Sequence, residues 1–143
     1  MASALHLLVR VAHVLGMAVL LGGAVVTWQT LRIENRDPRP VLRRYEWLFW
    51  GSIGVLIATG VGNLGTLGPP APTTRWGSIL TIKLLVVSGV VVLSAVRALA
   101  VGRLDDDSGS IPDPARDRLR LVYAATCWAL GATVVLAEVL AHG

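Results

Sequence analysis

The chain has 143 residues, the size of one domain, and 54% of them are hydrophobic while only 15% are charged, with a mean hydropathy of +0.65. Soluble domains carry about a quarter of their residues as charges, so this composition argues against a water-soluble enzyme. The formal charge is +4, and Cys127 is the single cysteine, which excludes an internal disulfide and a cysteine set for a zinc finger or an iron–sulfur cluster.

Four segments are long and apolar enough to cross a hydrocarbon core of about 30 Å, which takes about 20 helical residues. The first is too long for the core of a signal peptide and lacks a basic start, so we expect it to be retained. Backbone amides in lipid need partners within their own segment, which predicts helices. The sequence therefore predicts one all-α domain, a four-transmembrane-helix bundle, with spans at about Leu5 to Trp28, Tyr45 to Leu67, Trp76 to Val101 and Arg120 to Ala141.

Basic residues gather in two of the three connections. The first connection holds five arginines and the third holds four, whereas the second holds Arg75 alone. Because short cytoplasmic loops are enriched in arginine and lysine, the first and third connections are expected inside. Both the N-terminus and the C-terminus then lie on the outer side of a multi-pass protein, which we assign to the cell membrane of a prokaryote.

The span 5–28 carries three ionisable residues, each of which costs about 2.5 to 3.5 kcal/mol at the centre of a membrane helix. His6, Arg10 and His13 are spaced four and three residues apart, and Met17 follows four residues later. This spacing puts all four side chains on one helix face. We expect that face to line the interior of the bundle.

Each of the other spans also has a polar residue in its outer half. Counting at about 1.5 Å per residue, Lys83, Asn63 and Glu138 all lie within about 10 Å of the outer ends of their helices. In the apolar inner half, Arg97 is close enough to the interface to snorkel. The sequence thus predicts an outward-opening polar pocket in which Glu138 is the only buried carboxylate.

Haem b is the first ligand considered for this pocket. A neutral imidazole can ligate haem iron, and the two propionates would accept charge-assisted bonds from cationic side chains. His13 is the expected axial ligand and Arg10 or Lys83 the propionate partner, with Asn63 nearby. No second axial ligand is identified. The role would be electron transfer or haem handling.

Copper is the alternative ligand. Two imidazoles and a carboxylate near the outer mouth could form a partial set from His6, Glu138 and His142, with His13 and then Met17 deeper on the helix face that His6 begins. A third interpretation needs no ligand, because Glu138 could pair with Lys83 or Arg10 inside the bundle. The chain would then be a structural or accessory membrane subunit.

Three motifs carry a resemblance to known families. They are the segment 10–23 with Arg10-Val-Ala-His13, the Gly60-Val-Gly-Asn63 end of the second span, and Ile82-Lys83 in the third. In these motifs the chain resembles the copper-resistance protein D (CopD) family and the HemJ-type protoporphyrinogen oxidases. Both are four-helix membrane proteins with a basic residue three positions before a histidine and a lysine early in helix three.

The resemblance to the HemJ type implies haem b and a membrane oxidoreductase. That type has a Tyr-His pair after the lysine of helix three, where this chain reads Leu93-Ser94-Ala95, so catalytic residues and enzyme status stay open. The expected partners are the lipid bilayer and either a redox partner or a second copy of the chain, which the glycines of the second span would allow to approach closely. No nucleic acid is expected.

Overall fold

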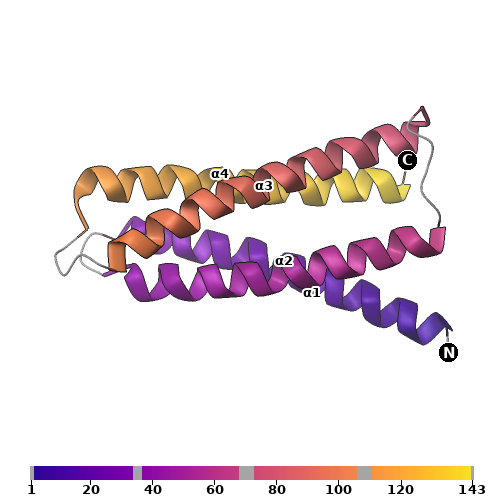
Figure 1. Cartoon of the computed structure of the whole chain (residues 1–143), viewed down its shortest axis with the longest axis horizontal. Coiled ribbons are helices and arrows are strands. Elements are labelled where there is room, and N and C mark those ends of the chain that lie inside the picture. The colour runs from indigo at the N-terminus through magenta and orange to yellow at the C-terminus, as the bar shows by residue number, and fades with distance from the viewer. Residues whose placement is uncertain (1, 34–36, 68–72, 106–110, 143) are drawn as a thin grey trace.

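The computed structural model consists of four long α-helices (Figure 1). It describes the backbone of residues 2–33, 37–67, 73–105 and 111–142, and the side chains of these except residues 2, 3, 5, 6, 62–67, 76, 105 and 140–142. The predicted all-α class is confirmed. The helices are α1 (Ala2–Leu31), α2 (Arg39–Leu67), α3 (Arg75–Asp105) and α4 (Asp113–His142).

The helices extend beyond the predicted spans, most of all at the starts of α2 and α4. Helix α2 begins at Arg39 rather than Tyr45, and the Asp37 carboxylate accepts a hydrogen bond from the Arg39 amide at 3.1 Å, as an N-cap does. Helix α4 begins at Asp113, with a proline in its first turn, where a missing amide hydrogen is tolerated. An apolar run marks only the part of a helix that can lie in lipid. The polar first turns of α2 and α4 lie outside the apolar runs, so hydropathy did not predict them.

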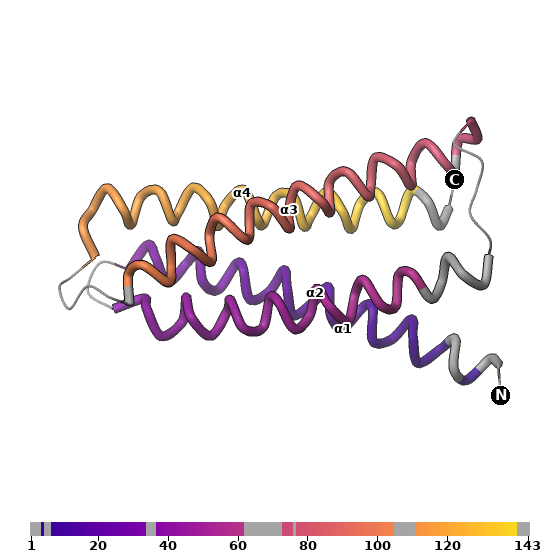
Figure 2. Tube along the Cα trace, viewed as in Figure 1, coloured from indigo at the N-terminus to yellow at the C-terminus, as the bar shows by residue number. Residues whose placement is uncertain are grey.

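The four helices form an antiparallel bundle (Figure 2). Helix α1 packs against α2 and α4, and α3 packs against α4 and, less extensively, against α2. The two chain termini and the α2–α3 connection lie at one end, here called the termini end, while the other two connections form the loop end (Figure 1). The N-terminal part of α1 leans away from the other helices at the termini end.

Three helices of the described chain are long and apolar enough to cross a membrane: Leu7–Arg32, Gly77–Leu104 and Asp113–Val139. Leucine and valine side chains cover their outer faces, as expected for contact with lipid. The chain is thus a multi-pass membrane protein that contacts the bilayer. The prediction of four spans is confirmed for three helices. The span in α2 stays a prediction, and the first two turns of that helix contain Arg39, Arg43, Arg44 and Glu46.

The best-packed part of the bundle lies toward the loop end. Leu20, Ala24, Phe49 and Tyr123 are completely buried there. The ring of Tyr45 lies so close to α1 that a Cβ at Gly23 would be 2.8 Å from it. The glycine therefore lets the tyrosine ring reach the centre of the bundle.

Candidate functional site

His13 lies half-buried on α1 and is held by a side chain of α2. Its Nδ1 atom is 2.9 Å from the hydroxyl oxygen of Thr59, and that hydroxyl is 2.8 Å from the Val55 carbonyl oxygen. If the single hydroxyl proton is donated to this carbonyl, the oxygen accepts a hydrogen bond from a protonated Nδ1. The lone pair of Nε2 is then available to a ligand, as in metal-binding histidines whose other nitrogen is fixed by a hydrogen bond.

A close approach of α1 and α2 makes this contact. A Cβ at Gly16 would lie only 3.3 Å from the Leu56 side chain, so the glycine allows the two helices to pack tightly one turn from the histidine. Met17 is half-buried against the core, one turn along α1 from His13. Lys83 is half-buried on α3. His13 and Met17 therefore share one face of α1, and Lys83 lies on a different helix of the bundle.

Two other predicted site residues, Arg10 and Glu138, are exposed. Arg10 is exposed, because the N-terminal part of α1 leans away from the bundle, and its predicted place in the interior is wrong. Glu138 is exposed on α4, so it is not the buried carboxylate of the chain. The side chains of His6, Asn63 and His142 lie outside the described residues. Within the described part, no three His, Cys, Asp or Glu residues converge as a metal-binding group.

The buried charges lie instead in the half of the bundle toward the loop end. The Arg97 side chain, on α3, is 1% exposed, and Glu46, on α2, is 8% exposed. Arg97 Nε donates to Glu46 Oε1 at 2.6 Å, and Nη2 donates to Oε2 at 3.3 Å, which makes a bidentate pair. The remaining donor, Nη1, reaches the hydroxyl of Thr126 on α4 at 2.9 Å.

Aromatic rings and a second hydroxyl complete this polar cluster. The hydroxyl of Tyr123 donates to Glu46 Oε1 at 2.8 Å from α4, across the bundle. The guanidinium carbon of Arg97 lies 4.7 to 5.1 Å from the ring centres of Phe49, Tyr123 and Tyr45. The Tyr45 hydroxyl donates to a carbonyl of α1 at 3.1 Å. The cluster thus joins all four helices.

This arrangement corrects the predicted distribution of polarity. Arg97 does not snorkel to the interface, because Glu46 supplies a partner that satisfies its charge inside the bundle. The sequence carried a signal for the pair: Arg97 is about 12 Å from the end of α3 and Glu46 about 10 Å from the start of α2, so both have the same depth from the loop end. Glu46 was overlooked because it follows an arginine-rich segment interpreted as a connection.

The two polar sites differ in what they can do chemically. The hydrogen bonds of the Arg97–Glu46 cluster join its own members from different helices, so it holds the helices together. His13 has a second ring nitrogen, for which the described residues show no hydrogen bond, and Met17 lies one turn away on the same helix face, which are properties of a binding site. The chain's candidate ligand site is therefore the His13 region, in the half of the bundle toward the termini end.

A family model described as copper resistance protein D matches residues 39–140. The chain belongs to the CopD family. The match supports the predicted resemblance, although it includes α4 and begins after the His13 motif. No curated protein and no solved structure showed a significant match to the chain. The protein is thus a CopD-family membrane protein, of a family associated with copper resistance.

Proposed function

We propose that this CopD-family protein binds copper inside the membrane and that His13 is the central ligand. The observation that carries the proposal is the hydrogen bond between His13 Nδ1 and Thr59, which in the tautomer protonated at Nδ1 leaves Nε2 to a ligand. A histidine held in one tautomer by a threonine of the neighbouring helix is prepared for a metal, because the ring neither rotates nor changes its donor atom when the ion binds.

The neighbouring side chains favour copper in its reduced form. Thioether sulfur is a soft ligand that selects Cu(I), and Met17 follows His13 by four residues, on the same face of α1. The half-buried ammonium group of Lys83 on α3 would repel a cation bound at His13. That repulsion is half as large for the singly charged Cu(I) as for Cu(II) at the same distance. His6, Glu138 and His142 are the proposed ligands through which the ion enters from the termini end.

Haem b on the same nitrogen is the second candidate, and Lys83 is the observation that favours it. A half-buried ammonium group on another helix of the bundle suits a propionate better than it suits a bare cation. Bound haem would supply one-electron chemistry, with Lys83 orienting the group through a propionate and Arg10 available nearer the surface. The propionate role of Lys83 distinguishes this candidate from copper binding, for which the lysine is a source of repulsion.

The orientation proposed for the protein follows its arginines. Six arginines lie at the loop end in the first turns of two helices, three in α2 (Arg39, Arg43 and Arg44) and three in α4 (Arg116, Arg118 and Arg120). With that end in the cytoplasm of a prokaryotic cell, the His13 region lies in the outer leaflet. The copper that this site handles then enters from outside the cell membrane.

Metal analysis of the purified protein separates the two candidates. We expect protein from copper-supplemented cells to carry copper without a Soret band, and X-ray absorption of the Cu(I) form to show both nitrogen and sulfur ligands. His13→Ala should lose the copper, and Met17→Leu should lose the sulfur signal while it keeps the packing volume. A Soret band in the unmodified protein that disappears in His13→Ala would show that the ligand of His13 is haem rather than copper. Copper bound equally well by His13→Ala would overturn both.

A further inference from the structure

One tryptophan lies at the centre of a membrane-spanning helix. Along α4, Trp128 is about 22 Å from the first residue of the helix and about 21 Å from the last. Its side chain is exposed, and within the described part of the chain the indole N–H has no hydrogen-bond partner. In a bilayer this donor would face hydrocarbon, which offers no acceptor. The position of Trp128 therefore calls for a covering group other than lipid.

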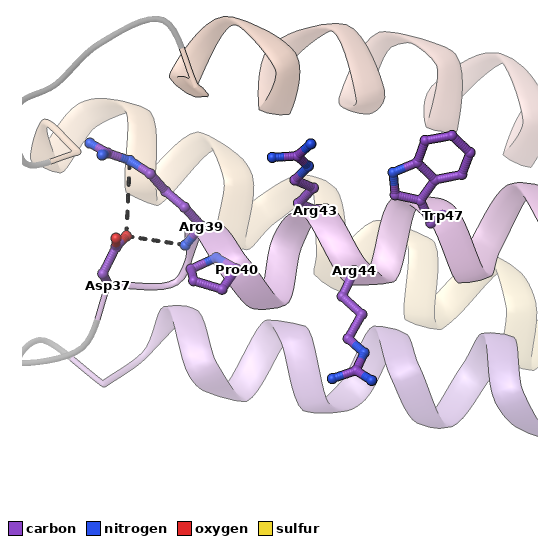
Figure 3. Close-up of a pocket in the computed structure, with 6 residues that line it drawn as sticks. All are labelled: Asp37, Arg39, Pro40, Arg43, Arg44 and Trp47. Atoms are coloured by element: carbon purple, nitrogen blue, oxygen red, sulfur yellow. Dashed lines mark hydrogen bonds and ion pairs between the residues drawn. The ribbon is translucent and has the colours of Figure 1, made fainter.

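Trp47 shows where an exposed tryptophan is usual in a membrane protein. Figure 3 shows Trp47 on the same side of α2 as Arg43, near the start of the helix. An indole beside cationic side chains near a helix end lies at the membrane interface, where its N–H can reach water or lipid headgroups. Trp47 is 76% exposed and Trp128 is 81% exposed. The two tryptophans thus differ in depth and not in exposure.

Trp128 belongs to a stripe of α4 that faces away from the bundle. Helix α4 packs against α1 and α3 through its opposite face, where Tyr123 and Leu130 are buried. The stripe residues are exposed, lie alternately four and three positions apart, and alternate between bulky side chains and alanine. They are Leu121, Ala125, Trp128, Ala132 and Val135. This spacing is that of a heptad seam, along which two helices pack as knobs into holes.

The stripe carries both halves of a contact with itself. In a parallel pair of helices, a side chain at the place of Trp128 enters a hole on the facing helix between residues three before, one after and four after its own counterpart. Those residues are Ala125, Ala129 and Ala132, which leave room for an indole. Two copies inserted in the same orientation bring Trp128 and this hole to the same depth, around a two-fold axis along the membrane normal.

The area of the stripe is also sufficient for a pair. From the exposed fractions of Leu121, Trp128 and Val135, two copies can remove about 1,000 Å² from contact with lipid, the size at which specific interfaces begin. We propose that this stripe of α4 is the interface of a homodimer in which Trp128 of each copy packs among the alanines of the other. The short alanine side chains let the indole N–H approach backbone carbonyl oxygens of the second copy.

Disulfide crosslinking of the full chain in liposomes tests this interface. Cys127, the single cysteine, is first replaced by serine, and each variant then receives one new cysteine. Ala125→Cys and Ala132→Cys should form linked dimers, because equivalent residues of the stripe face each other across the two-fold axis. Ala58→Cys is the matched control. It is exposed on α2 and, like Ala132, about 28 Å from the loop-end start of its helix, and it should stay monomeric.

Energy transfer between donor-labelled and acceptor-labelled copies, measured at increasing lipid dilution, gives the strength of the dimer. Trp128→Ala should weaken it about tenfold or more, as truncation of a central interface tryptophan does. Trp47→Ala removes an equally exposed indole and should leave the dimer unchanged. Ala132→Leu fills the hole and should also weaken the dimer. Because Ala132 is exposed, that variant should keep the unfolding temperature of the monomer in excess detergent.

Four results would overturn the interface. A chain that stays monomeric at every ratio of protein to lipid would leave the stripe to acyl chains. Dimers that Trp128→Ala does not weaken would use another surface, and dimers linked through Ala58→Cys would use the exposed face of α2. Ala132→Cys that crosslinks in native membranes only to a different protein would assign the stripe to that protein rather than to a second copy.

Discussion

Replacing Arg97 by methionine should destabilise the protein more than any other single change at the loop end. The variant keeps most of the side-chain volume but removes both donors that Arg97 gives to Glu46. Among the described residues, the carboxylate of the buried Glu46 would keep the hydroxyl of Tyr123 as its partner. Breaking a buried ion pair by removing one member costs about 3 to 5 kcal/mol. The three aromatic contacts of the guanidinium favour the upper part of that range.

The double variant Glu46→Met, Arg97→Met separates the charge effect from packing. Because it leaves no uncompensated charge, we expect it to be more stable than Arg97→Met alone by about 1 to 3 kcal/mol. The assay is unfolding in mixed micelles with increasing dodecyl sulfate, followed by circular dichroism, with Arg118→Met as the exposed control. The reasoning would be refuted if Arg97→Met unfolded together with the control, or if the double variant lost the sum of the two single losses.

Three further changes test the same packing by thermal unfolding in detergent. Gly23→Ala should lower the free energy of unfolding by about 1 to 3 kcal/mol, because the new Cβ would overlap the Tyr45 ring. Its control, Gly22→Ala, has nothing within 4 Å of the new Cβ and should be neutral or stabilising by up to about 1 kcal/mol. Equal effects of the two variants would contradict the close approach of Tyr45 to α1. Tyr123→Phe removes a hydroxyl that donates to a buried carboxylate and should cost about 1.5 to 3 kcal/mol, and an unchanged midpoint would speak against that bond. Ser94→Ala removes a buried hydroxyl that has no partner and should be neutral or stabilising by about 1 kcal/mol, so a clear loss would indicate a partner for it.

The helices could be predicted from the sequence because their apolar runs are long. The turns around Arg43 and Asp113 could not, because they are polar and lie beyond the apolar runs. A helix continues there through capping and through prolines in the first turn, which hydropathy does not detect. The exposed position of Arg10 was equally hidden, because the lean of α1 depends on how the helices pack.

The candidate site could be predicted in part. His13, Met17 and Lys83 stood out as polar or ligating groups within apolar spans, and all three are half-buried, two of them on one face of α1. The partner of His13 did not stand out, because Thr59 is a common helix residue whose role depends on the tight approach of α1 to α2 at Gly16. A residue type identifies a candidate ligand, whereas the group that orients it comes from packing.

The buried Arg97–Glu46 pair shows why charge alone gives an incomplete prediction. Each residue lies near the end of its helix, where a charged side chain can also reach water. The choice between an interface position and a buried pair depends on a partner at the same depth on another helix, which only the antiparallel arrangement provides.

The Cu(I) affinity of Thr59→Val tests the central claim most directly. Valine has the shape of threonine but cannot form a hydrogen bond with His13 Nδ1. The variant therefore keeps the histidine and loses the group that orients its ring. Competition with a chromophoric Cu(I) chelator should show about 10- to 100-fold weaker binding in Thr59→Val, with affinity recovered in Thr59→Ser. Thr59→Val protein that is folded and binds Cu(I) as tightly as the unmodified chain would contradict the account.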